Sequence, residues 1–525
     1  MANANLNNSK KIMAESRIRN TNRNILGSIA NNIVMLLLPF LVRTAIIYTF
    51  GAEYLGLNSL FSAILNMLAL AELGFGSAMV FSMYKPIAQN NIPEVSALLN
   101  LYRKIYRIIG STIFLVGLCL MPFLDKLIKG DPPAEMNIYI LYLIFLSRTV
   151  LSYFLYAYKS SILTAAQHQY VMTNISTILS VVIELIKIAV VLVFKNFYLY
   201  CLIAVPSVVI YNLIVNHVVN RDYPQYKCKG TLDKAILTDI KKRVAGLFTY
   251  KICYVFRDMF GSIVVSAFIG LAVLGQYNNY MYIYTSVAGF LNLLRTSMQA
   301  SIGNSIAIES EAKNHDDFRR FHCLYMFIAT WFSVCLFALY QPFIKVWIGD
   351  DWLLDDMTMA SFCLLFFIGN NGDMCMTYRH AAGLWWQDRF RPIVESIVNV
   401  ALCFLLVKPL GVLGINISTI FCMFCINSFW ASWVLYRYYF KSYRLWDYVK
   451  RLLFYMTVFF VTAALVFFIC RLLPLDGVWR LVVTLVICLV VPPLVIYPSF
   501  HILPEAKTAF PYIKTILRIG VKSKS

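Results

Sequence analysis

Residues 43–88 read RTAIIYTFGAEYLGLNSLFSAILNMLALAELGFGSAMVFSMYKPIA, and this stretch decides the fold. It begins inside one apolar helix, turns over between Gly51 and Gly56, and returns through a second apolar helix. Within the apolar parts, only Arg43 and Glu72 are charged. The second helix carries small and polar residues within one arc of roughly 120°: Asn58, Ser62, Asn66, Glu72 and Gly76. Two membrane-length helices with polar faces need a polar protein interior to point into.

The composition places the rest of the chain in a lipid bilayer. Of its 525 residues, 60% are hydrophobic and 14% are charged, and the mean hydropathy is +0.68. A bilayer covers that much apolar surface, whereas a soluble fold of this length does not. The apolar runs do not alternate with polar residues, which argues against a transmembrane β-barrel. The sequence therefore predicts an all-α integral membrane protein, and we expect no cleavable signal peptide because residues 1–23 are polar and basic.

The apolar runs predict about fourteen transmembrane spans. They cover residues 24–49, 55–84, 105–124, 137–158, 172–194, 198–219, 244–269, 276–303, 321–344, 357–379, 392–408, 412–436, 452–473 and 478–498. Lysine and arginine gather in alternate loops, so the positive-inside rule predicts that both termini are cytoplasmic. Topology and attraction to anionic lipid explain the formal net charge of +20, and we expect no nucleic-acid binding.

A long basic segment divides the chain into two similar parts. At a shift of 219 or 220 residues the matching pairs include Leu55-Gly56 with Leu274-Gly275, Pro122-Phe123 with Pro342-Phe343, and Tyr158-Lys159 with Tyr378-Arg379. Six predicted spans separate equivalent positions, so the two repeats have the same orientation and are related by an axis along the membrane normal. The predicted domains are a cytoplasmic N-terminus (1–23), an N-lobe (24–219), a cytoplasmic linker (220–243), a C-lobe (244–438), two additional helices (439–499) and a cytoplasmic tail (500–525).

Two parallel six-helix bundles with short loops are typical of a transporter that works by alternating access. Charges inside its spans usually face the interior, because they are costly in lipid. Guanidinium groups match phosphate oxygens, so we predict a site for an anionic, phosphate-bearing substrate. The predicted cavity residues for the phosphate are Arg43, Arg148, Lys251, Arg257 and Arg295. The predicted charge-balancing or coupling residues are Glu72, Glu184, Lys187, Asp258 and Asp373. A further acidic residue, Glu395, opens the eleventh span.

Structural explanations of some of these charges stay open. Glu184 and Lys187 lie three residues apart on one helix face, where they can form an ion pair. Lys251 and Asp258 share a face two turns apart and can do the same. Arg43 is close enough to the outer turn to reach the lipid headgroups.

Other features favour packing over chemistry. Glu72 lies near a glycine-rich turn, where it can hydrogen-bond to another helix. Tyr277, Tyr280, Tyr282 and Tyr284 are typical of an interfacial aromatic belt, and the alternative is a surface that stacks on sugar rings. The histidines show no metal-ligand spacing, and Cys422-x-x-Cys425 has no partner pair of ligands. The sequence contains no glycine-rich phosphate loop or nucleophile motif, so we predict no cofactor, no metal and no enzyme activity.

The segments RTAIIYTFGAEYLGLNSLF (43–61) and LAELGFGSAMVFSMYKPIA (70–88) resemble the first two helices of Wzx-type polysaccharide flippases, in the multidrug/oligosaccharidyl-lipid/polysaccharide (MOP) exporter superfamily. The resemblance covers about residues 24–165, including GDPPAEMNIYILYL (130–143) and TVLSYFLYAYKSS (149–161). In the second half, PFIKVWIGDDW (342–352) is similar to the family's outer-loop pattern.

This resemblance implies two lobes in a V-shaped bundle of twelve to fourteen helices around a central cavity. It implies that an undecaprenyl-diphosphate-linked oligosaccharide is moved from the cytoplasmic to the outer leaflet of a bacterial cytoplasmic membrane. Protons, sodium or the membrane potential would drive the movement, and a polysaccharide polymerase and glycosyltransferases are the implied partners. Relatives bind the pyrophosphate with cationic cavity residues, which implies that role for Arg43, Arg148 and Arg257.

Two other functions stay open. A MATE-like multidrug or cation exporter of the same superfamily would favour carboxylates in its cavity. A membrane-bound polysaccharide polymerase or ligase would need larger extracytoplasmic loops than those expected at 125–137 and 345–356.

Overall fold

The computed structural model describes residues 37–511, except residues 73–74, 130–131, 134, 167, 235, 239, 242–243, 245–258 and 385. Three predicted site residues, Lys251, Arg257 and Asp258, therefore lie outside the described residues. The described part of the chain is all-helical, as predicted, and contains no strand. It divides by packing into two units, Met1–Gly275 and Gln276–Ser525, which are called the N-unit and the C-unit below.

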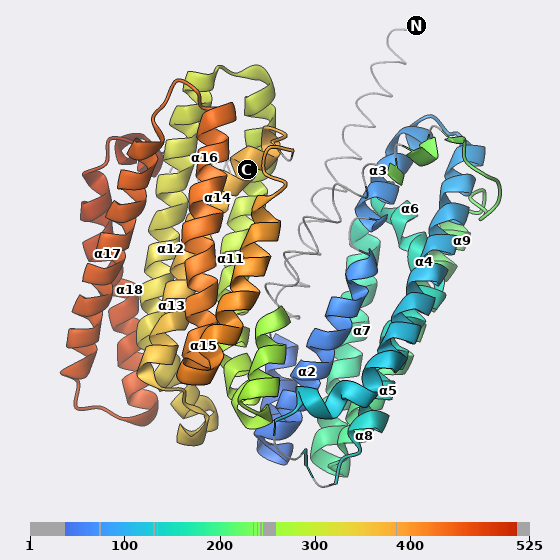
Figure 1. The fold of residues 1–525 in the computed structure, drawn as a ribbon, viewed down its shortest axis with the longest axis horizontal. Helices are drawn as coiled ribbons and strands as arrows, with labels where there is room; N and C mark the ends of the chain where they lie inside the picture. The colour runs from blue at the N-terminus through green and yellow to red at the C-terminus, as the bar shows by residue number, and fades with distance from the viewer. Residues whose placement is uncertain are drawn as a thin grey trace, which may run out of the picture. The chain divides into compact units, whose positions relative to one another are not determined.

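The N-unit is built from helices coloured blue to green in Figure 1. In chain order they are Leu37–Phe50, α2 (Ala52–Leu68), η1 (Ala69–Glu72), α3 (Phe75–Ala88), α4 (Ile92–Leu120), η2 (Met121–Leu127), α5 (Ile138–Phe154), η3 (Tyr156–Lys159), α6 (Ser160–Ala165), α7 (Gln169–Ala189), η4 (Val190–Phe194), α8 (Phe197–Leu202), α9 (Ala204–Asp222) and Met259–Phe268. The centre of this bundle is α5, which packs against α4, α2 and α9.

The C-unit is built from helices coloured green to red in Figure 1. They are the remainder of α11 (Leu271–Ile308), then α12 (Glu311–Ile348), η5 (Asp350–Trp352), α13 (Asp356–Asn371), α14 (Asp373–Ala381), α15 (Arg391–Phe421), η6 (Cys422–Ser428), α16 (Phe429–Tyr438), α17 (Leu445–Arg471) and α18 (Gly477–His501). The central helix is α12, which packs against α13, α17 and α18. Glu505, just after α18, pairs with Arg319 of α12 at 2.7 Å and with Arg451 of α17 at 2.8 Å, which fastens the last two helices to α12.

The predicted repeats begin in the same way. Gly51 and Gly270, which are 219 positions apart, both have a positive φ, of +91° and +136°. Glycine adopts this backbone conformation readily because it has no Cβ. The helices α2 and α11 each begin at the residue that follows.

Equivalent glycines one turn later make reciprocal contacts within the N-unit. Gly56 of α2 lies against the backbone of Leu271, and Gly275 of α11 lies against the backbone of Ala52. A Cβ at position 275 would be 2.6 Å from the Ala52 carbonyl oxygen, so only glycine permits this approach. Reciprocal contacts of this kind are expected where two equivalent segments meet about a two-fold axis.

The predicted number of fourteen spans is not confirmed. Seven described helical runs are long and apolar enough to cross a membrane, or up to eight when the bent pair of helices Ile138–Phe154 and Tyr156–Ala165 is counted. Within one of these runs, Arg391–Tyr438, the chain reverses its direction at the place where the sequence predicts a break between two spans. Gly411 has a non-helical φ of 58°, and Asn399 donates a hydrogen bond to Thr419 at 3.3 Å. Residues this far apart in one continuous helix would be separated by about 30 Å.

Taken together, these helical runs make the chain a multi-pass membrane protein.

Candidate functional site

A pocket in the N-unit brings together side chains from five helices. Its empty volume is about 270 Å³. It is lined by Asn58 of α2, Phe145 and Arg148 of α5, Lys187 of α7, Tyr200 and Cys201 of α8, and Ala204 of α9. Two of the predicted site residues, Arg148 and Lys187, therefore lie in the same pocket although they come from different helices.

Local sequence signals position the helices that carry these side chains. The Asn137 side chain caps the N-terminus of α5, which carries Arg148. In the same way, Asn196 caps α8, which carries Tyr200. Between them, α7 carries Lys187 in its last turn and continues directly into the π-helix η4. Single π-helical turns inside α-helices are frequent at functional sites.

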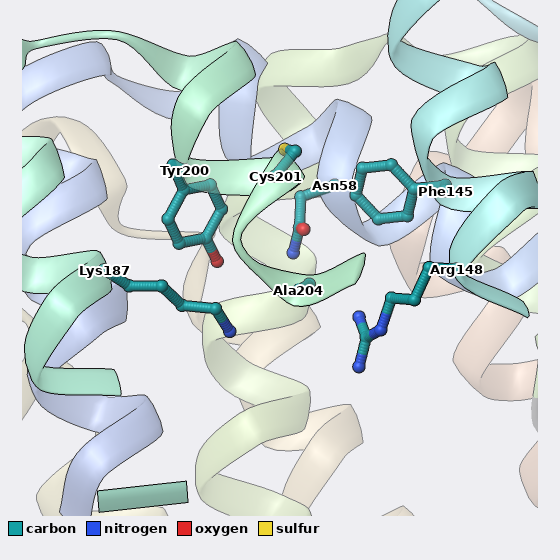
Figure 2. Close-up of a pocket in the computed structure, with 7 residues that line it drawn as sticks. All are labelled: Asn58, Phe145, Arg148, Lys187, Tyr200, Cys201 and Ala204. Atoms are coloured by element: carbon teal, nitrogen blue, oxygen red, sulfur yellow. The ribbon is translucent and has the colours of Figure 1, made fainter. Parts of the chain in front are cut away.

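The polar ends of four lining side chains meet in one space. Figure 2 shows Lys187 and Arg148 approaching that space from opposite sides, with the amide of Asn58 and the hydroxyl of Tyr200 pointing into it between them. The Lys187 ammonium donates to Glu184 at 2.7 Å and lies 5.6 Å from the centre of the Tyr200 ring. Arg148 is exposed and makes no hydrogen bond or ion pair with any described residue. Its charge is therefore open to a ligand.

Cations outnumber carboxylates around this pocket. Arg43, on the first described helix, and Arg148 are both close enough for their charges to act on the hydroxyl of Tyr200. Lys187 supplies a third positive charge. Glu184 is the carboxylate whose charge also acts on Tyr200, and it is already paired with Lys187. Three cations and one carboxylate thus surround the same hydroxyl group.

Glu72 is placed differently and does not line this pocket. Tyr106 donates a hydrogen bond to one carboxylate oxygen, and Tyr153 donates to the other at 2.8 Å. The hydroxyl of Tyr102 donates to that of Tyr106 at 2.9 Å. This carboxylate therefore links η1 to α4 and α5, which is the interhelical hydrogen bonding that the sequence left open.

Arg295 and Asp373 lie together in the C-unit. Nε of Arg295 is 3.8 Å from Oδ2 of Asp373, and the two side chains are 23% and 25% exposed. The same carboxylate oxygen accepts a hydrogen bond from Tyr325 at 2.9 Å. Among the described residues, no group of three or more histidine, cysteine or acidic side chains is arranged to hold a metal ion.

A buried ionic network in the C-unit was not anticipated from the sequence. Asp388 pairs with Arg379 and, at 3.0 Å, with Arg391, which in turn pairs with Glu395 at 2.7 Å. Each of these side chains is at most 5% exposed. The stretch between α14 and α15 contains one aspartate and one arginine and gave no sign of this network, and only the position of Glu395 at the start of a predicted span pointed to it.

Two of the four tyrosines near the start of α11 do not belong to the expected interfacial belt. Tyr277 and Tyr280 are buried, at 6% and 0% exposed. Tyr280 stacks against Tyr340 and Phe362, and its hydroxyl donates to Gln341 at 2.7 Å. These two side chains are core residues of the C-unit, where helix packing rather than contact with lipid headgroups accounts for them.

Comparison with known proteins identifies the fold. No protein-family model matches the chain, and no curated protein does. The lipid II flippase MurJ in an inward closed conformation is similar in structure, with a TM-score of 0.65 and 16% identity over 91% of this chain and 99% of that one. An inward-facing multidrug resistance MATE transporter of the MOP superfamily has a TM-score of 0.62 and 14% identity, over 81% of this chain and 99% of that one.

A third similar structure is the MATE transporter VcmN from Vibrio cholerae, with a TM-score of 0.57 and 12% identity over 82% of this chain and all of that one. The chain therefore has the fold of MOP-superfamily transporters, and the predicted fold class is confirmed. At these identities the likeness concerns the fold.

Proposed function

We propose that this chain flips an undecaprenyl-diphosphate-linked oligosaccharide from the cytoplasmic to the outer leaflet of a bacterial cytoplasmic membrane. The observation that carries the proposal is the guanidinium group of Arg148, which has no carboxylate partner among the described residues and lies in a positively charged pocket. Two further observations support it. Residues 43–88 resemble Wzx-type flippases, and the fold is shared with a flippase whose named substrate is a lipid.

A diphosphate matches the chemistry of the pocket. A guanidinium group binds phosphate oxygens through two parallel hydrogen bonds, and a neighbouring ammonium adds charge. The side chains of Asn58 and Tyr200 make no hydrogen bond with the described residues, so both have a donor available for a ligand. In this proposal Arg148, Arg43 and Lys187 bind the diphosphate while the oligosaccharide extends out of the pocket.

The polyprenyl tail stays in the bilayer during transport, because removing it from lipid would cost about 0.8 kcal/mol per CH₂ group. Lys251 and Arg257 are proposed as further cationic ligands, and Asp258 and Asp373 as balancing or coupling carboxylates. Protons, sodium or the membrane potential would drive alternating access. Glycosyltransferases that build the unit on the cytoplasmic side, and a polymerase that consumes it outside, are the proposed partners.

The second candidate is an exporter of organic cations, which the similarity of the fold to multidrug MATE transporters favours. A cationic drug needs an available carboxylate in its site. In the pocket described above, Glu184 is already paired with Lys187 at 2.7 Å. The positive field around Tyr200 therefore favours the flippase.

The experiment is to delete the gene and measure lipid-linked oligosaccharide, with an impermeant sugar-modifying reagent reporting the leaflet. The flippase predicts that complete units accumulate on the cytoplasmic leaflet, and their mass then identifies the sugar unit. Accumulation on the outer leaflet would overturn the proposal in favour of a step after flipping, such as polymerisation. Unchanged lipid-linked oligosaccharide together with new sensitivity to cationic drugs would favour the exporter.

A further inference from the structure

We propose that Asp373 is an internal competitor for Arg295, so that the binding of an anionic substrate to the C-unit exchanges the carboxylate of Asp373 for a phosphate. Arg295 then contributes a second cationic contact, separate from the pocket of the N-unit. The inference rests on the proposed function because it requires an anionic ligand.

The Arg295–Asp373 pair is looser and more accessible than the other buried pairs of the C-unit. Its N–O distance is 3.8 Å and its side chains are 23% and 25% exposed. By contrast, Arg391 pairs with Glu395 at 2.7 Å, and those side chains are 3% and 5% exposed. A pair at hydrogen-bonding distance and out of reach of water is fixed, whereas in a longer pair that water reaches, a competing anion can displace the carboxylate.

The pair lies where polar groups of several helices meet. Asp373 is the first residue of α14, and Arg295 reaches it from α11. Tyr325 of α12 hydrogen-bonds with Asp373 and with Asn370 of α13. Polar groups from four helices are therefore concentrated beside Arg295.

Tyr325 allows Asp373 to lose its cation. The Tyr325 hydroxyl lies 2.9 Å from Oδ2 of Asp373 and 2.8 Å from Oδ1 of Asn370. A hydroxyl has one proton, so it donates to one of these acceptors at a time. The hydrogen bond from Tyr325 to Asp373 does not depend on Arg295, so the carboxylate keeps it when Arg295 leaves. Without such a donor, a carboxylate left by its cation would be expensive to bury.

Arg295 also makes a hydrogen bond to a neutral side chain, and this hydrogen bond does not depend on Asp373. Its Nη2 donates to Asn292 at 2.6 Å, one turn earlier on α11, and Asn292 is exposed. The guanidinium therefore keeps a hydrogen bond on its accessible side while its Nε is released. Both members of the pair thus have hydrogen bonds to neutral groups that remain when the pair separates. These hydrogen bonds lower the cost of replacing Asp373 by a competing anion.

The test measures the binding of undecaprenyl diphosphate to the purified full-length chain in nanodiscs of phosphatidylcholine. Asp373→Asn removes the competing charge, so we expect the Kd to fall by about two- to fivefold. Tyr325→Phe removes the hydroxyl that satisfies the carboxylate, so Asp373 holds Arg295 more firmly and the Kd should rise. A merely structural role for these neighbours predicts weaker binding in both variants. Opposite signs are therefore the signature of competition.

Two further measurements make the result decisive. In an Arg295→Ala background, Asp373→Asn should leave the Kd unchanged, because nothing is left to compete for. Asp373→Ser gives a second way to remove the carboxylate if the Asn variant does not fold, as judged by size-exclusion chromatography. Weaker or unchanged binding in both Asp373 variants, with wild-type binding intact and lost in Arg148→Ala, would overturn this inference and leave the proposed function standing. No binding of undecaprenyl diphosphate to the wild-type chain would overturn both.

Discussion

The interior cations of the two units differ in whether each has a carboxylate partner. In the C-unit, Arg295, Arg379 and Arg391 each lie beside a carboxylate. In the N-unit, Arg148 has no ion-pair partner among the described residues, and Lys187 has the one nearby carboxylate, Glu184. Over the whole sequence, cations and acids inside the spans are almost balanced in number. Their distribution, rather than their number, makes the N-unit pocket positive.

One pair of equivalent positions shows the same difference directly. Lys159 of the first repeat corresponds to Arg379 of the second, 220 positions later. Lys159 donates to the neutral amide oxygens of Asn216 and Asn220, at 2.6 Å each. Arg379 pairs instead with the buried carboxylate of Asp388. At this pair of positions, the cation of the C-unit is neutralised by a carboxylate, whereas the cation of the N-unit is bound by neutral groups.

The largest effect is expected where the C-unit network is broken. Asp388→Asn leaves Arg379 and Arg391 buried without their shared counter-ion, and we expect about 3–5 kcal/mol of destabilisation. Thermal unfolding of the purified chain measures it. The matched control is Asp350→Asn, which removes an exposed partner of Lys345 and should cost about 1 kcal/mol or less. Equal losses in the two variants would contradict a special role for the network.

The next effect concerns ligand binding rather than stability. Arg148→Ala should weaken the binding of undecaprenyl diphosphate by about ten- to a hundredfold, because a charge-assisted pair of hydrogen bonds is lost. Its Tm should stay close to that of the wild type, since no partner is left unpaired. Arg148→Lys keeps the charge but not the planar fork, and should bind with intermediate affinity. A large loss of Tm in Arg148→Ala would show that this residue is structural.

A carboxylate placed in the N-unit pocket should make it resemble the C-unit. Asn58→Asp is nearly isosteric and adds a negative charge to the space that Arg148 faces. We expect diphosphate binding to weaken by about fivefold as the new charge neutralises the guanidinium. Asn58→Leu, which removes the donor without adding charge, is the comparison. The electrostatic account fails if the Leu variant loses more affinity than the Asp variant.

The smallest effect is expected at Lys159. Lys159→Met removes hydrogen bonds to two neutral amides, and we expect a loss of about 1–2 kcal/mol in the free energy of unfolding. The equivalent substitution Arg379→Met should cost about 3–5 kcal/mol, because it removes one of the two cations that pair with the buried carboxylate of Asp388. Chemical unfolding of the two variants side by side compares the repeats. Similar losses would mean that the two side chains contribute equally to stability despite their different partners.

The sequence predicted the fold class and some residues of the candidate site. Composition and the length of the apolar runs are enough to specify a helical membrane protein, and the predicted repeat rests on matched pairs such as Leu55-Gly56 and Leu274-Gly275. The proximity of Arg148 and Lys187 follows from a simple rule, that charges on membrane helices face a common interior. The number of spans did not follow as readily, because bent helices such as Ile138–Phe154 with Tyr156–Ala165 do not show clear boundaries in a hydropathy pattern.

The partners of individual side chains were beyond the reach of the sequence. Helical periodicity shows that Glu72 lies on a polar face, but not that Tyr106 and Tyr153 meet it there. Tyr280 was expected at the lipid headgroups because tyrosine is common there, yet burial against Phe362 decides its place. Asn58 was placed on a polar helix face but was not predicted to bind a ligand, and Tyr200 carried no signal because it lies in a short apolar helix.

The central claim is that the N-unit pocket selects an anion. The most direct measurement is the binding of two ligands of opposite charge, undecaprenyl diphosphate and the lipophilic cation tetraphenylphosphonium, to the wild-type chain and to Arg148→Ala in nanodiscs. The account predicts that the wild type binds the diphosphate and not the cation, and that Arg148→Ala loses diphosphate binding while remaining folded. Binding of tetraphenylphosphonium without binding of the diphosphate would contradict it.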